Sequence, residues 1–243
     1  MKKIIQVLIL LCVSGYFMVA HAQIKYSLIL GPNLSTFEQK GGNENFQPYK
    51  TKFKLGYQVG LLADYELNTN LSIRSGAYFI SKGSAFDVEG NNNIKLNYLE
   101  VPINLVYKII RVQIFGGPYL ALGLGGKAKY DYTLTVDGLN VEFEGENKYK
   151  PVFGKAECSA TTSYFKAFDF GIKGGIGYEL KSFVISIAYS LGLRNLQPEL
   201  KGGGDCLTLD PDISLPPGSV VELPELSKKH RLISLNLSYK LTK

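Results

Sequence analysis

Residues 53–67, FKLGYQVGLLADYEL, alternate between two kinds of side chain along their whole length. One set is apolar or aromatic throughout, and the other mixes glycine with polar and charged residues such as Lys54, Asp64 and Glu66. Because a β-strand points successive side chains to opposite faces, this period of two predicts a strand with one apolar and one largely polar face. A soluble barrel would turn the apolar face inward, whereas a membrane barrel would turn it out toward lipid.

The amino-terminal segment predicts export. Two lysines and an apolar run over residues 4–20 precede Ala20-His21-Ala22, which has the small-x-small pattern of a signal-peptide cleavage site. We therefore expect a cleaved signal peptide at residues 1–22 and a single domain over residues 23–243. Loss of the two lysines lowers the formal net charge from +6 to about +4, a mild excess that predicts no nucleic-acid partner.

The alternation recurs in eight segments, each long enough to cross a bilayer as a tilted strand. They are residues 24–35, 53–67, 71–82, 96–109, 112–126, 167–180, 183–194 and 231–241. No run after the signal peptide reaches the roughly 18 apolar residues of a transmembrane helix. A membrane-embedded form of this chain would therefore have to be a closed barrel.

The connections between these segments alternate strictly in length. Three are short, at residues 68–70, 109–111 and 180–182, and four are long, at residues 36–52, 83–95, 127–166 and 195–230. Small outer-membrane barrels have short periplasmic turns and longer external loops. We therefore predict an all-β fold: an eight-stranded antiparallel up-and-down transmembrane β-barrel with short periplasmic turns and long extracellular loops.

The two faces of the predicted strands have different compositions. Aromatic residues of the apolar face gather near the short turns and the termini, as in an interfacial girdle. The predicted periplasmic girdle is Tyr26, Tyr65, Tyr107, Tyr178, Phe183 and Tyr239. The polar face interleaves glycines with charges of both signs, which suits the narrow lumen of an eight-stranded barrel. The predicted lumen charges are Lys54, Asp64, Glu66, Arg74, Lys82, Glu100, Lys108, Asp169, Lys173, Glu179, Arg194 and Lys240.

Six segments carry a more specific pattern: GPNLSTF (31–37), LNYLEVPINLVYK (96–108), FGGPYLALGLG (115–125), FDFGIKGGIGYEL (168–180), YSLGLRNL (189–196) and RLISLNLSYKL (231–241). Together they resemble the PorT-type outer-membrane β-barrel family of small porin-like barrels. The most specific elements are Leu99-Glu100-Val101-Pro102 and, one strand later, Gly117-Pro118-Tyr119. The resemblance implies a Gram-negative outer membrane and, from the family's namesake, a part in protein secretion.

Residues that could carry chemistry are sparse. The single histidine after the signal peptide, His230, lies near Ser227 and Glu225, from which a Ser-His-acid enzyme could be built. The simpler interpretation of His230 is a solvated loop residue. One histidine and two distant cysteines form no recognisable metal-binding pattern. We therefore predict no catalytic, cofactor-binding or metal-binding residues and a non-enzymatic protein.

The long loops contain two further signals. Cys158 and Cys206 lie in the third and fourth loops, and because exported proteins meet an oxidising compartment we predict a disulfide between them. The alternative is two free thiols. Asp137-Gly138, within residues 133–144, joins two short alternating arms and predicts a β-hairpin. Its arms are too short to span a bilayer, so the hairpin should project outward.

Three hypotheses of function follow. Long loops on a rigid scaffold favour a surface-binding or adhesion barrel, or an accessory to secretion, with outer-membrane lipid, envelope or secretion proteins and surface glycans as partners. The alternative is a narrow porin-like channel or carrier for small solutes, although the charged side chains leave little lumen. A lipid-modifying enzyme centred on His230 is the least favoured.

Overall fold

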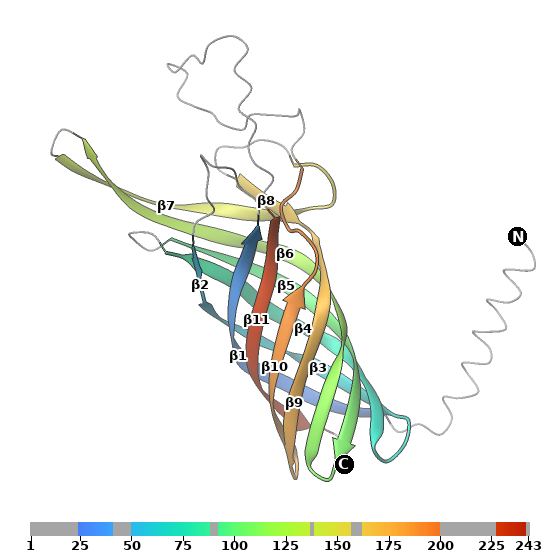
Figure 1. The fold of residues 1–243 in the computed structure, drawn as a ribbon. Coiled ribbons are helices and arrows are strands. Elements are labelled where there is room, and N and C mark those ends of the chain that lie inside the picture. Colours follow the sequence, from blue (N-terminus) through green and yellow to red (C-terminus); the bar gives the residue numbers. More distant parts are fainter. Residues whose placement is uncertain are drawn as a thin grey trace, which may run out of the picture.

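The computed structural model describes residues 24–40, 50–87, 92–136, 139–156, 162–199 and 227–241. Within these residues the chain forms strands and tight turns (Figure 1). The strands are β1 (Ile24–Lys40), β2 (Thr51–Lys52), β3 (Lys54–Glu66), β4 (Leu71–Phe86), β5 (Asn93–Ile109), β6 (Val112–Val136), β7 (Leu139–Val152), β8 (Thr162–Lys166), β9 (Phe168–Leu180), β10 (Phe183–Gly192) and β11 (Ser227–Lys240).

Eight of these strands close into an antiparallel barrel. The ring runs β1-β3-β4-β5-β6-β9-β10-β11 and returns to β1. The closing seam joins the first and last strands in a register from Ser27↔Lys240 to Lys40↔Ser227. Near its far end, Nη2 of Arg231 lies 2.8 Å from Oε1 of Glu38. The predicted fold class is confirmed.

The barrel has two unlike ends. At one, the turn end, three tight turns join β3 to β4, β5 to β6 and β9 to β10 (lower end in Figure 1). Both ends of the described chain meet there, because the backbone N–H of Leu241 donates to the carbonyl oxygen of Tyr26 at 2.8 Å. Ile110 and Lys181 adopt positive φ angles of 57° and 38°, the left-handed conformation that two-residue turns commonly need. We call the opposite end the loop end.

The barrel is apolar outside. In β10 the odd-numbered residues 183–189 are apolar and 42–55% exposed, whereas the even-numbered residues 184–190 are at most 7% exposed. The same alternation runs along β1, β5, β9 and β11. Among the described residues, no helix has the length and apolar character needed to cross a membrane. The outward faces of the strands form an apolar belt, which is the arrangement that lipid requires.

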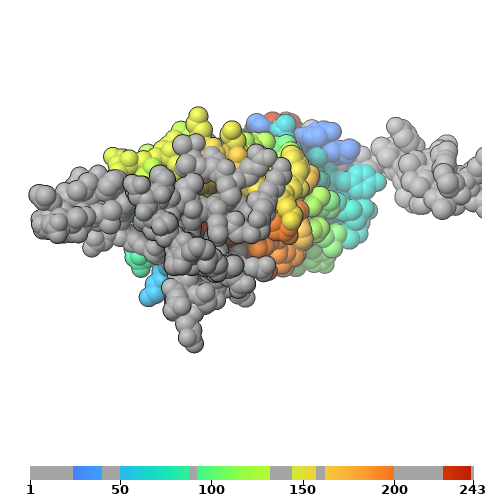
Figure 2. Space-filling model, turned by 90° about the horizontal axis from the view of Figure 1, so that it is seen from above, coloured from blue at the N-terminus to red at the C-terminus, as the bar shows by residue number. Residues whose placement is uncertain are grey.

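The longest strand, β6, leaves the barrel at the loop end and continues with β7 as a two-stranded extension (Figure 1). Their pairing runs from Gly126↔Tyr149 to Val136↔Leu139, so the predicted hairpin is confirmed but its arms are longer than expected. The sequence did not reveal this length, because β6 continues from the wall into the extension as one strand. Seen from above, the yellow atoms of β7 and β8 lie over this end of the molecule (Figure 2).

A β-bulge marks the point where the extension begins. The register between β5 and β6 shifts beside Asn97 and Tyr98, and Gly125 there has a φ angle of 136°. An extra residue on one strand reverses which side chains face outward. In β6 the exposed residues are accordingly even-numbered before the bulge, as at Leu120 and Leu124, and odd-numbered after it, as at Lys127.

Several predictions fall on other parts of the chain. The signal peptide at residues 1–22, the cysteines Cys158 and Cys206, and the turn residues Asp137 and Gly138 lie outside the described residues. The disulfide therefore stays a prediction.

Candidate functional site in the barrel lumen

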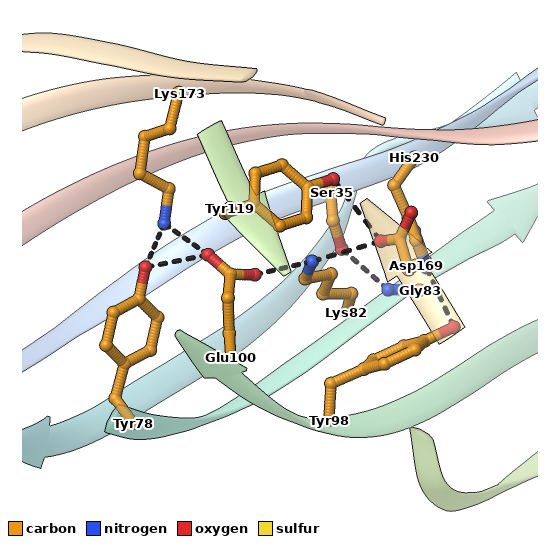
Figure 3. Close-up of polar contacts among 10 residues, drawn as sticks. All are labelled: Ser35, Tyr78, Lys82, Gly83, Tyr98, Glu100, Tyr119, Asp169, Lys173 and His230. Carbon is orange, nitrogen blue, oxygen red and sulfur yellow. Dashed lines mark hydrogen bonds and ion pairs between the residues drawn. The ribbon is translucent and has the colours of Figure 1, made fainter. Parts of the chain in front are cut away.

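Four charged side chains meet in the middle of the lumen (Figure 3). They are Lys82 of β4, Glu100 of β5, and Asp169 and Lys173 of β9, and none is more than 6% exposed. Oε2 of Glu100 lies 2.6 Å from Nζ of Lys82, and its Oε1 lies 2.5 Å from Nζ of Lys173. Nζ of Lys82 also lies 3.4 Å from Oδ2 of Asp169. Two cations and two anions balance, which allows this central cluster to remain ionised away from water.

Tyrosine side chains complete the central cluster. The hydroxyl of Tyr78 donates to Oε1 of Glu100 at 2.7 Å and accepts a hydrogen bond from Lys173. The hydroxyl of Tyr119 donates to Oδ2 of Asp169 at 3.3 Å, and Nζ of Lys82 lies 4.6 Å from the centre of the same ring. A cation close to an aromatic ring gains further electrostatic stabilisation. The rings therefore both fill the lumen and stabilise its charges.

Glycines on the lumen side provide the space for these rings. A Cβ atom added at Gly171 would lie 2.7 Å from Cε1 of Tyr119, and one at Gly175 would lie 2.6 Å from Cζ of Phe115. Each glycine also lies close to backbone of the adjacent strand β10. The glycine spacing of the polar faces is thus a packing requirement of a filled, narrow barrel.

A second polar network lies nearer the turn end. Nε of Arg74 donates to Oδ1 of Asp64 at 2.7 Å, and its Nη2 donates to Oε1 of Gln113 at 2.9 Å. Glu179 pairs with Lys108 at 2.6 Å and also with Lys240. The charged groups of this network are less buried than the central cluster, with side-chain exposures from 12% to 37%.

The loop end of the lumen is apolar and includes His230. The prediction of a solvated His230 is wrong: the residue is 1% exposed, and its Nε2 lies 3.2 Å from the hydroxyl of Tyr98. Its ring lies 5.0 Å from that of Phe37. β11 begins at Ser227, four residues before the predicted start at 231, so His230 shares the inward face of Leu232. A tyrosine hydroxyl, rather than Ser227, lies beside the imidazole, and Glu225 is outside the described residues.

Most of the predicted lumen charges belong to these groups. The central cluster contains Lys82, Glu100, Asp169 and Lys173, the turn-end network contains Asp64, Arg74, Lys108, Glu179 and Lys240, Glu66 pairs with Lys25 at the turn end, and Lys54 donates to Oδ1 of Asn93. Arg194 lies elsewhere: it follows the end of β10 and lines an outward-facing groove. Strand parity no longer places a side chain once the strand has ended.

The predicted girdle residues lie on the outward face toward the turn end. Tyr26, Tyr107, Tyr178, Phe183 and Tyr239 are 42–49% exposed, and Tyr65 is partly exposed. The rings of Phe183 and Tyr239 lie 5.1 Å apart on neighbouring strands.

The lumen tyrosines Tyr78, Tyr98 and Tyr119 were not among the predicted site residues. Each shares its strand's inward face with a predicted lumen charge or a buried polar residue, as Tyr98 does with Glu100 on β5. Strand parity was the signal that could have found them.

In the described parts of the chain, no group of three or more His, Cys, Asp and Glu side chains lies close enough together to hold a metal ion.

A closed barrel with an apolar belt and a charged, filled lumen defines an outer-membrane type of β-barrel. A family model described as outer membrane protein beta-barrel domain matches residues 20–197. The chain belongs to this family, which places it in the outer membrane with its turn end toward the periplasm.

Several solved structures are similar. The attachment invasion locus protein Ail of Yersinia pestis has 14% identity and a TM-score of 0.41, over 89% of this chain and 98% of that one. Neisserial surface protein A has 10% identity and a TM-score of 0.43, over 89% and 97%. OprG from Pseudomonas aeruginosa has 9% identity and a TM-score of 0.36, over 90% and 97%. Likeness at this level carries no argument about function. No curated protein matches the sequence.

Proposed function

We propose that this protein is a non-enzymatic outer-membrane barrel with a closed lumen, whose extension of β6 and β7 and outer loops bind proteins or glycans at the cell surface. The supporting observation is a contrast between the two regions. The lumen is filled by paired charges and aromatic rings, whereas the β6–β7 pairing continues for seven positions beyond the end of β5. Regular structure that projects from a rigid scaffold is well suited to recognition.

Closure of the lumen is supported at two levels. The central cluster occupies the middle, and apolar side chains occupy the loop end, where Phe37, Tyr98, Phe165 and Leu232 are at most 3% exposed. Phe165 comes from β8, which is not part of the barrel wall. Its ring lies so close to the wall that a Cβ atom added at Gly123 would be 2.4 Å from it. A loop segment therefore packs into the mouth of the barrel.

We also propose that the chain is a PorT-type member, exported by a signal peptide at residues 1–22, with an accessory role in protein secretion. Its two most specific sequence elements lie side by side, because Pro102 pairs with Tyr119 across β5 and β6. Glu100 and Tyr119 from these elements both belong to the central cluster. Both family-like elements therefore contribute side chains to the packing of the lumen, which supports membership of that family.

The surface-binding role can be tested by shortening the extension. Lys129 pairs with Glu146, so removing residues 130–145 and joining these two through an Asn-Gly turn should leave the barrel wall intact. Insertion is checked by heat-modifiable gel migration. We expect the shortened protein to insert normally but to lose surface binding by whole cells or to change the set of secreted proteins.

A photo-crosslinker at Glu144, on the extension, should yield adducts of defined mass in intact cells. The matched control is a crosslinker at Lys181, in a turn at the opposite end. Unchanged surface binding and secretion in the shortened variant, or equal adducts from both positions, would contradict the proposal.

A second candidate, a narrow channel or carrier, is favoured by one observation. Several buried polar atoms in the described lumen lack a hydrogen-bond partner, among them Oε1 of Gln58, Oδ1 of Asn104 and Oδ1 of Asp169. Such atoms commonly bind ordered water, and a water file can conduct small solutes. Planar-bilayer recording separates the candidates, since discrete conductance supports the channel and silence supports the closed barrel. For the enzyme hypothesis, His230→Ala should leave the lipid composition unchanged.

A further inference from the structure

The outward face of the strands changes character beyond the apolar belt. After the bulge at Gly125, this face presents lysines from three neighbouring strands. They are Lys95 of β5, Lys127 and Lys129 of β6, and Lys148 and Lys150 of β7, all exposed. We call them the lysine row. Lys95 pairs across the strands with Lys127, and Lys127 pairs with Lys148, so the row is continuous.

The lysine row carries an excess of positive charge. The described carboxylates on the same face are Asp131 of β6 and Glu144 and Glu146 of β7, so five lysines face three carboxylates. Nζ of Lys127 lies 2.7 Å from Oε1 of Glu146. This hydrogen bond, joined by the charges of Lys127, Lys129 and Lys148, lowers the pKa of Glu146 below its ordinary value. One carboxylate thus lies within the field of several ammonium groups.

An apolar groove lies directly below the lysine row. It has a volume of about 300 Å³ and opens on the outward face of β5, β6 and β9. Its lining includes Leu99, Leu120, Leu122, Phe168 and Phe170. Leu99 follows the row's Lys95 by four residues on the same face of β5, a separation of roughly 13 Å along an extended strand.

Arg194 gives this groove a positive charge at its edge. The residue follows the end of β10, at the loop end of the barrel, and its side chain joins the groove lining. The lysine row lies at the height of a membrane interface. Nζ of Lys95 lies 5.3 Å from the centre of the Tyr57 ring, and that ring lies 5.8 Å from the ring of Phe79. Exposed aromatic rings at this level are typical of the headgroup boundary.

We propose that this surface binds a phosphate-bearing lipid of the outer leaflet, with an acyl chain in the groove and its phosphates against Arg194 and the lysine row. The groove opens on the lipid-facing belt, so hydrocarbon is its natural occupant. The basic side chains begin where the belt ends, which is where the phosphates of an anchored lipid must lie. A soluble polyanion would use the lysines but leave the groove without a role.

The test uses the full mature protein, folded in neutral detergent micelles and examined by native mass spectrometry. The probe is diphosphorylated lipid A, compared with its dephosphorylated form and with a heparin fragment. The variant Lys129→Gln/Lys148→Gln/Lys150→Gln/Arg194→Gln removes charge from exposed or partly exposed positions. The control Lys50→Gln/Lys155→Gln/Lys181→Gln removes charge from exposed positions elsewhere. Heat-modifiable migration confirms that every variant is folded.

We expect the wild type to bind diphosphorylated lipid A, and the quadruple variant to lose at least about tenfold in affinity, because each basic residue near an anionic lipid surface contributes severalfold. The control should bind as the wild type does. Equal binding of dephosphorylated lipid A would overturn phosphate recognition. An equal loss of affinity in the control variant would show that binding depends only on the net charge of the protein. A heparin fragment that binds as tightly and displaces lipid A would refute a lipid site and indicate a glycan-binding surface.

Discussion

The substitution Glu100→Gln tests whether the central cluster stabilises the barrel. It keeps the shape of the side chain but removes the negative charge that lies between Lys82 and Lys173, at 2.6 Å and 2.5 Å. Coulomb's law with an effective dielectric constant of about 20 gives roughly 6 kcal/mol for each contact. Removing the carboxylate also removes its desolvation penalty of several kcal/mol. We therefore expect a loss of about 3 to 5 kcal/mol in the free energy of unfolding, the usual cost of breaking a buried ion pair.

The assay is equilibrium unfolding in guanidinium chloride, with the protein in phospholipid vesicles. Because the chain has no tryptophan, far-ultraviolet circular dichroism is the better probe of β-structure. With a slope of roughly 4 kcal/mol per molar denaturant, the midpoint should fall by about 1 M. The matched control is Glu66→Gln, which breaks the exposed pair with Lys25 and should cost less than about 1 kcal/mol.

A second variant separates charge balance from local damage. Glu100→Gln leaves Lys173 without its carboxylate partner, whereas Glu100→Gln/Lys173→Met also removes that cation and keeps the pair of Lys82 with Asp169 at 3.4 Å. We expect the double variant to recover part of the lost stability. A stabilising role of the central cluster is ruled out if Glu100→Gln costs no more than Glu66→Gln, because the cluster would then lie in water rather than in a dry lumen.

Three further predictions concern other parts of the barrel. Gly60→Ala should cost about 1 to 3 kcal/mol, because its Cβ would lie 2.3 Å from Cβ of Tyr78, while Gly154→Ala, with nothing within 4 Å, should be neutral in the same unfolding assay. Tyr98→Phe should cost about 1 to 3 kcal/mol by leaving Nε2 of the buried His230 without its partner, and an unchanged midpoint would show that the imidazole is solvated. Desolvation lowers the pKa of Lys228 below 10.5, so keeping this side chain charged destabilises the folded protein at neutral pH. Lys228→Met should therefore raise the melting temperature at pH 7, and the gain should vanish as the pH rises through about 10.5. A gain that does not depend on pH would contradict this origin.

The period of two predicted the barrel because membrane strands must alternate, and a one-residue slip would put Lys173 into lipid at a cost of about 2 to 4 kcal/mol. Residue type alone did not separate the inward tyrosines from the outward ones. An apolar ring with a hydroxyl suits both the interface, as at Tyr239, and a charged lumen, as at Tyr119. Burial of the hydroxyl depends on cross-strand neighbours, which only the closed ring brings together.

The strand ends were the other weakness. His230 lies on an inward face only because β11 starts at Ser227, in a polar stretch without an apolar pattern. Arg194 leaves the lumen because β10 ends at Gly192. Outside the belt, lipid no longer enforces the alternation, so a repeat along the chain cannot show where pairing stops.

The bulge at Gly125 gives β6 one residue more than its neighbour β5 at the level of Asn97 and Tyr98. Loss of one codon there would leave Lys127 opposite Lys95 on the outward face, because the residue removed has no cross-strand partner, whereas the same loss lower in β6 would turn lumen side chains toward lipid. A lineage of such chains could therefore gain or lose a residue at this position without passing through a form that fails to insert.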